Sequence, residues 1–213
     1  SRRRGGVGVG RCRPPGDLDR AFGALVLGGV LGDGQRLRIP GEDLPEVVEA
    51  LAFIEKIHTE PLPEISLGAR VAVIGCGNTA IDAATQARRL GAEVLVVYRR
   101  GESEMSAYAF EYDLAKRDGA NFLFHHAPVE VLAENGHVVG LRLQPTTAGD
   151  PMVIEPCDMV IKAVGQQKQG GWISGLFPDL TLNPNGTLAR DSRTGQQSHP
   201  HMSSVGDGAK GGR

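Results

Sequence analysis

The segment GCGNTA, residues 75–80, has the residue types and the spacing of a phosphate-binding turn. It directly follows the apolar run VAVI (71–74) and opens an expected helix over residues 78–90. The first glycine permits a sharp strand-to-helix turn, the second lets a pyrophosphate approach the backbone, and Ala80 is small enough for close packing of helix on strand. Free N–H groups at the helix start attract negative oxygens. The segment predicts a dinucleotide-binding unit, and the alternative is a glycine turn that serves packing alone.

A pair of arginines indicates which dinucleotide this unit prefers. The second strand of the unit, VLVVY (94–98), ends directly before Arg99 and Arg100. An acidic residue at this position binds the ribose 2′-hydroxyl of NAD, whereas arginine accommodates the 2′-phosphate of NADP. Glu93 precedes the strand and is poorly placed for the acidic role. The charges therefore favour NADPH over NADH, against the alternative of two solvated arginines at a strand end.

Three polar residues at the start of the helix have both a functional and a structural interpretation. Asn78 and Thr79 can contact phosphate, but helix capping explains them almost as well. Asp82 lies one turn into the helix, where a carboxylate also interacts favourably with the helix dipole. The residues predicted to bind the nicotinamide cofactor are Gly75, Gly77, Asn78, Thr79, Ala80, Asp82, Arg99 and Arg100.

No catalytic or metal-binding group is predicted. His125 and His126 end an expected strand without matching metal ligands, so we interpret them as structural or surface residues. Cys12, Cys76 and Cys157 lie far apart, with no C-x-x-C pair and no zinc-like spacing. The cysteines indicate neither a dithiol redox centre nor an intrinsic iron–sulfur site.

Composition excludes several classes of partner. The 213 residues carry a formal net charge of -2 and are 40% hydrophobic, which is ordinary for a globular protein with a substantial core. Nucleic-acid and membrane-surface proteins need a concentrated basic field, which this chain lacks. No run approaches the roughly 20 apolar residues that span a bilayer, and the start lacks a secretory signal. We therefore predict a cytoplasmic protein that binds neither nucleic acid nor membrane.

The pattern of elements predicts an α/β fold, a Rossmann-like doubly wound parallel sheet with an antiparallel hairpin or meander. A helix over 107–118, with Leu114 and Ala115 facing inward, and a strand over 121–126 continue the strand–helix alternation. Asn135-Gly136 is a strong hairpin signal, and so is Asn185-Gly186. The remaining expected elements are a buried strand within 21–31, a helix over 45–57 that buries Val47, Val48, Leu51, Ile54 and Ile57, hairpin strands at 128–133 and 138–143, and a strand at 158–164.

Several separated motifs, in the correct order, resemble one known family. VAVIGCGNTAIDAATQARRLGAEVLVVYRR, MSAYAFEYDLAKRDGANFLF, VIKAVGQ and VGDGAKGG are similar to the glutamate synthase small-chain family of FAD and NAD(P)H oxidoreductases. Within this family, GNTAID, AFEYDLAK and GDGAKGG most resemble the electron-input subunit of bacterial dihydropyrimidine dehydrogenases. The resemblance runs from about residue 20 to the end of the sequence.

The resemblance implies a two-cofactor architecture in which an NAD(P)H domain interrupts an FAD domain. It implies FAD-domain segments at 20–44 and 166–213 and an NAD(P)H-binding insert at 45–165. Residues 1–19, where glycines and arginines show no apolar period, are expected to form an atypical or disordered tail. Asp207, with Gly206, matches the family's FAD-binding acidic residue, and Gly165 and Gln166 match the segment that recrosses between the domains. An FAD-domain G-x-G-x-x-G turn is missing from residues 1–20, so we expect an internal fragment of a larger flavoprotein.

The resemblance also implies an activity and a partner. NAD(P)H would reduce FAD, and electrons would leave toward an iron–sulfur-containing catalytic partner subunit of the dihydropyrimidine dehydrogenase or glutamate synthase type. An alternative is a dinucleotide-binding module, or a truncated inactive fragment, without turnover. A thioredoxin-reductase-like activity is disfavoured because the C-x-x-C pair is missing.

Overall fold

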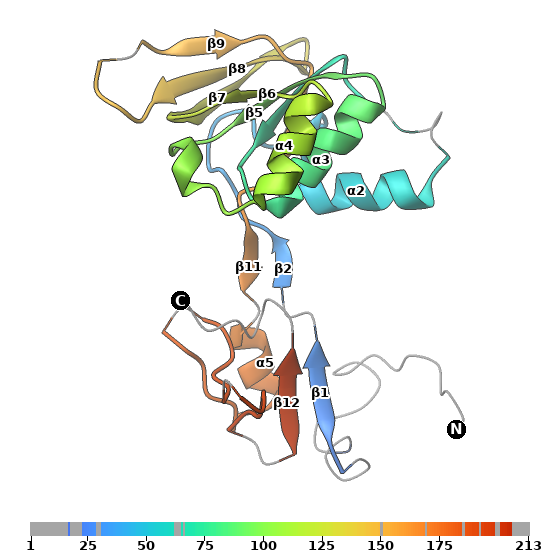
Figure 1. The fold of residues 1–213 in the computed structure, drawn as a ribbon, viewed down its shortest axis with the longest axis vertical. Helices are drawn as coiled ribbons and strands as arrows, with labels where there is room; N and C mark the ends of the chain where they lie inside the picture. Colours follow the sequence, from blue (N-terminus) through green and yellow to red (C-terminus); the bar gives the residue numbers. More distant parts are fainter. Residues whose placement is uncertain are drawn as a thin grey trace. The chain divides into compact units, whose positions relative to one another are not determined.

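The computed structural model describes residues 17, 23–28, 31–61, 65, 67–149, 151–168, 170–184, 186–191, 193–198 and 201–205. The chain forms two compact units, shown with their elements in Figure 1. One unit is continuous and comprises Gly34–Gly165. The other comprises Ser1–Asp33 together with Gln166–Arg213. The chain therefore passes from one unit to the other twice.

A parallel sheet forms the centre of the unit Gly34–Gly165. Its strand order is β3-β10-β4-β5-β6, and every printed pairing in it is parallel. From β4 the next strands in sequence, β5 and β6, are added on one side, whereas β10 and β3 lie on the other side of β4. The strand order therefore switches between the neighbours β4 and β10. The predicted doubly wound parallel sheet is confirmed. Its strands are β3 (Val47–Glu49), β4 (Arg70–Ile74), β5 (Glu93–Val97), β6 (Asn121–Leu123) and β10 (Met159–Lys162).

Apart from Arg70, Glu93 and Lys162 at their ends, the central strands β4, β5 and β10 are apolar, because both faces of the sheet are covered. Helices α2 (Ala50–Thr59), α3 (Asn78–Arg89) and α4 (Ala109–Arg117) cover one face in Figure 1. Alternate residues point to opposite faces of a strand. Val71 and Val73 accordingly pack in the core cluster under the helices, whereas Ala72 and Ile74 pack in the cluster on the other face.

An antiparallel sheet covers the second face. It consists of β7 (His126–Glu134), β8 (His137–Pro145) and β9 (Val153–Glu155) in that order. The predicted hairpin turn is confirmed, because Asn135 and Gly136 have φ angles of 51° and 82°. Positive φ at both central residues is the requirement of the tight turn that Asn-Gly favours. Strand β9 was not predicted, since its three residues are too few to show a period.

Two details of the predicted helices are wrong. Residues Val47–Glu49 form the edge strand β3, and the helix begins only at Ala50. As a result Phe53 is buried and Leu51 is 46% exposed, the reverse of the expected orientation for Leu51. In α4, Ala115 is buried as expected, but Tyr112 takes the inward position assigned to Leu114, which is exposed. Both errors arise where apolar residues fit more than one register of the pattern.

The second unit contains a smaller core. Strand β1 (Leu25–Gly28) pairs in parallel with β12 (Met202–Val205). Helix α5 (Gly170–Leu176) is followed in sequence by Phe177, which packs in a core cluster with Leu188 and Met202. Val26 is 67% exposed, so the expected burial of this strand is wrong at that residue. Strand β2 (Leu31–Gly34) pairs with β11 (Gln166–Lys168). Leu182 and Leu188 form an antiparallel bridge around Gly186, at the second predicted turn, whereas Asn185 lies outside the described residues.

Within the described ranges, none of the helices is long and apolar enough to cross a bilayer.

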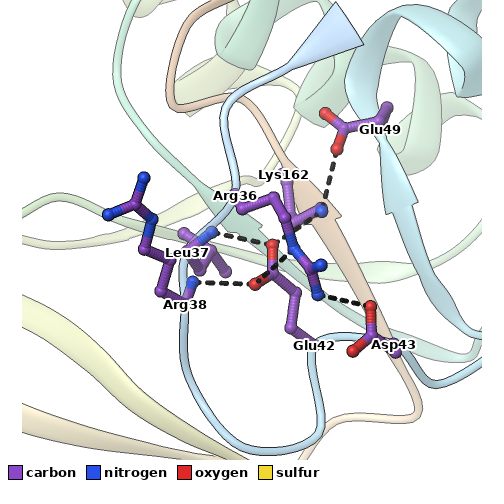
Figure 2. A network of polar contacts seen from close by, with 7 residues as sticks. All are labelled: Arg36, Leu37, Arg38, Glu42, Asp43, Glu49 and Lys162. Carbon is purple, nitrogen blue, oxygen red and sulfur yellow. Dashed lines mark hydrogen bonds and ion pairs between the residues drawn. The ribbon is translucent and has the colours of Figure 1, made fainter.

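A buried carboxylate fixes the segment that enters the unit Gly34–Gly165. The Glu42 side chain is 2% exposed and accepts hydrogen bonds of 2.7 Å from the backbone N–H groups of Leu37 and Arg38. Its Oε1 also lies 3.0 Å from Nζ of Lys162, at the end of β10, and Lys162 bonds Glu49 of β3 at 2.8 Å (Figure 2). This network joins a loop and two strands that are distant in sequence.

Hydrogen bonding keeps the Glu42 carboxylate charged. Burial alone would raise its pKa, but the hydrogen bonds from Lys162, Leu37 and Arg38 outweigh burial and lower the pKa to about 2. The folded-state pKa is therefore below the usual value of the unfolded chain. A depressed carboxylate pKa stabilises the fold above the unfolded pKa and loses that effect as the pH falls through the folded one.

Replacing Glu42 should lower the free energy of unfolding in a pH-dependent manner. Glu42→Gln leaves Lys162 with one carboxylate fewer in a buried site, and we expect a loss of about 3 kcal/mol at pH 7. The difference from wild type should shrink as the pH falls from 4.5 towards 2. Urea denaturation across this pH range measures it. The exposed Glu55→Gln is the control, and an equal small effect of both substitutions would contradict the assignment.

Candidate dinucleotide-binding site

The turn between β4 and α3 requires glycine at its first position. Gly75 has a φ of 122° and donates a hydrogen bond of 2.9 Å to the carbonyl oxygen of Val97. A Cβ atom at Gly75 would lie 2.9 Å from the carbonyl carbon of Ala163, which follows β10. Backbone strain and a backbone contact thus both exclude a side chain. The turn is therefore held between β5 and the backbone that follows β10, and these two strands are the neighbours of β4.

The second glycine begins helix α3. Gly77 is the N-cap residue, with extended backbone and no capping side chain, so the first N–H groups of α3 lack a side-chain acceptor. Ala80 is completely buried where the helix meets the sheet. Small residues therefore place the positive end of the helix dipole at the carboxyl edge of β4, which is the arrangement that binds a pyrophosphate.

Asn78 has a different role from the capping one considered from sequence. Its Oδ1 accepts a hydrogen bond of 3.0 Å from the backbone N–H of Tyr108, which directly precedes α4. The capping alternative is therefore wrong for Asn78. The Asn78 side chain instead links the start of α3 to the loop before α4 through its oxygen. Its Nδ2 group is a hydrogen-bond donor. Thr79 is exposed, and Asp82 is exposed with only a long contact of 3.5 Å to Gln86.

The two arginines follow β5 at the same edge of the sheet. Ile74 and Val97 pair in register at the ends of β4 and β5, so the glycine turn and the arginines leave adjacent strands on one side. Both backbones are fixed, because Thr146 donates to the carbonyl of Arg99 at 2.7 Å and His125 to that of Arg100 at 3.1 Å. Within the described part of the chain, neither exposed guanidinium has a hydrogen-bonding or ionic partner.

A loop that the sequence analysis did not single out completes the site. The short helix η2 (Glu102–Glu104) follows the arginines, and Glu104 accepts a 3.1 Å hydrogen bond from the N–H of Gly101. Further along, the Ser106 hydroxyl lies 3.3 Å from the position that a Cβ at Gly77 would take. The loop therefore passes over the glycine turn. The motif MSAYAFEYDLAK was the available signal, but its residues carry no period or charge pattern that indicates this contact.

The remaining predicted site residues are placed differently. Gly165, with a φ of 98°, follows β10 and belongs to the same unit as the glycine turn, whereas Gln166 begins β11 in the other unit. Gly206 and Asp207 lie outside the described residues. The structure therefore brings together the glycine turn and the arginines, with Gly165 at the same carboxyl edge of the sheet.

The cysteines and histidines have structural environments. Cys76 and Cys157 are buried and not disulfide-bonded, and burial raises the pKa of their thiols to about 11 and about 12. Such thiols are protonated and unreactive at neutral pH. His126 is buried with Nδ1 2.8 Å from the carbonyl oxygen of Phe124, and His125 is exposed. The described residues contain no cluster of His, Cys, Asp and Glu that could hold a metal ion, and Cys12 lies outside them.

A parallel sheet with a glycine turn opening the helix after β4 defines the Rossmann-like class of α/β proteins. The chain belongs to the pyridine nucleotide-disulphide oxidoreductase family, whose model matches residues 27–213. The fold is similar to that of thioredoxin reductase from T. acidophilum, with a TM-score of 0.70 and 17% identity over 89% of this chain and 58% of the other. A ferredoxin reductase from Rhodopseudomonas palustris has a TM-score of 0.64 and 25% identity over 88% and 44%.

Curated relatives share parts of longer proteins with this chain. The NADP(+)-dependent formate dehydrogenase subunit beta of Moorella thermoacetica is 29% identical over 92% of this chain and 30% of the relative. The glutamate synthase (NADPH) small chain of Halomonas elongata is 36% identical over 68% of this chain and 33% of the relative. The chain thus spans about a third of the length of these relatives.

Adding a methyl group at Gly75 should destabilise the fold more than adding one at another glycine of positive φ. Gly91 has a φ of 103° with open space around its Cβ position, so Gly91→Ala reports backbone strain alone, about 1–2 kcal/mol. Gly75→Ala must also displace the Ala163 backbone, which brings the expected loss to about 3 kcal/mol or more. Chemical denaturation compares the two. Equal losses would show that the contact with Ala163 is unimportant.

Proposed function

We propose that this chain is the nucleotide-binding part of an NAD(P)H-dependent flavin oxidoreductase, and that the unit Gly34–Gly165 binds NADPH in preference to NADH. The observation that carries the proposal is a pair of guanidinium groups, with no partner among the described residues, beside a helix N-terminus that lacks a side-chain cap. These are two separate anion-binding features at one edge of the sheet. NADPH has two matching anionic groups, a pyrophosphate and a 2′-phosphate.

The residues around the turn fit a pyrophosphate. Gly75 and Gly77 keep the surface free of side chains, and the N–H groups at the start of α3 point towards an approaching anion. In the proposal, the Nδ2 group of Asn78 and the hydroxyl of Thr79 add further donors. Ala80 sets the close helix packing, and Asp82 stays a predicted site residue at the exposed side of the first turn.

The arginines fit the 2′-phosphate. A guanidinium group forms paired hydrogen bonds with phosphate oxygens and stays charged at neutral pH. The hydrogen bonds to the backbone carbonyls of Arg99 and Arg100 fix both residues at the end of β5. The charged guanidinium groups take no part in these two hydrogen bonds. When bound, a reduced nicotinamide supplies a hydride to a flavin, a transfer that depends on alignment rather than on an acid–base pair. The role of this chain's residues is accordingly to bind and orient.

The family and its relatives support the wider proposal. Pyridine nucleotide-disulphide oxidoreductases give a precedent for FAD beside NAD(P)H, and several relatives carry NADP or NADPH and the word subunit in their names. We propose that Ser1–Asp33 and Gln166–Arg213 contribute to an FAD domain through Gln166, Gly206 and Asp207, and that Gly165 takes part where the chain recrosses between the two units. Electrons would then pass to an iron–sulfur-containing partner subunit. The narrower assignment to the dihydropyrimidine dehydrogenase or glutamate synthase type rests on the sequence motifs quoted above.

Removing either arginine should weaken NADPH binding selectively. For Arg99→Ala and Arg100→Ala we expect the dissociation constant of NADPH to rise about tenfold or more, while that of NADH changes less than about threefold. The reason is that only NADPH carries the 2′-phosphate. Titration followed by the fluorescence of the reduced cofactor measures both constants.

Arg117→Ala is a matched control, because Arg117 is an exposed arginine in the last turn of α4, away from the edge where β5 ends. It should leave both dissociation constants unchanged. The proposal fails if wild type binds no NADPH, or if NADPH affinity is indifferent to both substitutions at the end of β5.

A further inference from the structure

A cavity of about 450 Å³ lies at the amino edge of the central parallel sheet. Arg70, Glu93 and Asn121 line it, and they are the first residues of the adjacent strands β4, β5 and β6. The glycine turn and the arginines of the proposed dinucleotide site lie at the carboxyl edge of the same sheet. The length of β4, roughly 13 Å, separates the two edges. The cavity is therefore distinct from the dinucleotide site.

The first residues of these strands point to the face that the antiparallel sheet covers. Alternate residues of a strand share one face. Arg70 thus lies on the same face as Ala72, and Glu93 on the same face as Leu95. Ala72 and Leu95 both pack in the core cluster under the antiparallel sheet, and both also line the cavity. The cavity accordingly has an apolar floor below a rim of polar side chains.

The antiparallel sheet and the link to β10 supply the opposite wall, through Glu155 and Cys157. Glu155 ends β9 and lies two residues after Val153, which packs in the same core cluster, so the Glu155 side chain faces the parallel sheet. The pKa of the Cys157 thiol is raised by burial and further by Asp158 and Glu155, whereas Arg70 lowers it. The charges of the rim therefore act on the floor of the cavity.

The polar side chains of the rim are not used by the fold. In the part of the chain that the structure describes, the side chains of Arg70, Glu93, Asn121 and Glu155 form no hydrogen bond or ion pair. Arg70 and Glu93 pair in register on neighbouring strands, yet their charges stay apart. The Arg70 backbone is fixed, because its N–H donates to Oδ1 of Asp158 at 2.9 Å. The rim thus presents a guanidinium group and two carboxylates above an apolar floor.

We propose that this cavity binds a small zwitterion with an apolar side chain, which is the chemistry of an aliphatic α-amino acid. The Arg70 guanidinium forms paired hydrogen bonds with the ligand carboxylate. Glu155, assisted by the more exposed Glu93, binds the ammonium group, and the aliphatic side chain lies on Ala72 and Leu95. A ligand with a single charge would leave one side of the rim unmatched. The volume lies within the range of small-molecule sites, about 300–1,000 Å³.

The first test is to titrate the ¹⁵N-labelled full chain with three probes and follow its backbone amide signals by NMR. The probes are L-leucine, isopentylamine, which lacks the carboxylate of leucine, and 4-methylpentanoate, which lacks the ammonium group. Leucine should shift the signals of residues 70–72, 93–95, 155 and 157. It should bind about tenfold more tightly than either probe of single charge, because each of these loses one charged hydrogen-bonded contact.

Two substitutions assign the charges of the ligand to the rim. Arg70→Ala should raise the dissociation constant of leucine about tenfold and leave that of isopentylamine unchanged, because only leucine carries a carboxylate. Glu155→Gln should weaken leucine and isopentylamine together and spare 4-methylpentanoate. Arg117→Ala and Glu55→Gln, which change exposed charges on helices α4 and α2, are the matched controls and should have no effect.

Several results would overturn the inference. No shift with leucine at up to about 10 mM, a range that detects millimolar affinity, or shifts confined to residues outside the cavity, would remove the site. Equal affinity for leucine and isopentylamine would show that the ligand is not recognised as a zwitterion. Equal losses in the variants and their controls would indicate a general charge effect. Arg99→Ala should leave leucine binding unchanged, so failure of NADPH binding and failure of this site are separate outcomes.

Discussion

The closest constraint in the site is the contact between Gly75 and the backbone after β10. The turn passes so near the Ala163 carbonyl that no side chain fits, and its N–H bonds Val97 at the end of β5. The end of β4 is therefore fixed by both neighbouring strands. This contact determines where α3 begins and where its free N–H groups lie. The arginines after β5 and the loop over the turn are placed relative to the same point.

A second constraint operates where the chain enters this unit. Glu42 and Lys162 are 120 residues apart, and their ion pair joins the entering loop to the strand that precedes the exit. A buried pair of this kind adds little net stability compared with apolar packing, but the loss of one partner is costly. Its value here is in specifying one arrangement of loop and strands. The segment before β3 and the end of β10 are thereby tied together within the unit.

The local parts of the site could be predicted from sequence, and the long-range parts could not. The strand, the glycine turn, the helix and Arg99 lie within a short stretch, where period and glycine spacing are sufficient evidence. Asn135-Gly136 likewise identified its hairpin, since few other residues tolerate its φ angles. Strand β3 was missed because three apolar residues before a helix fit the helical period equally well. The approach of Ser106 to Gly77 depends on tertiary contacts, which have no sequence signature.

The central claim is that one edge of the sheet binds a phosphorylated dinucleotide through the start of α3 and the end of β5. The most direct test is to follow the backbone amide signals of the ¹⁵N-labelled chain by NMR during titration with NADPH. The account predicts that the largest shifts occur at residues 75–80 and 99–102, with little change in the β7–β8 hairpin. Shifts confined to other regions, or none at saturating NADPH, would contradict it.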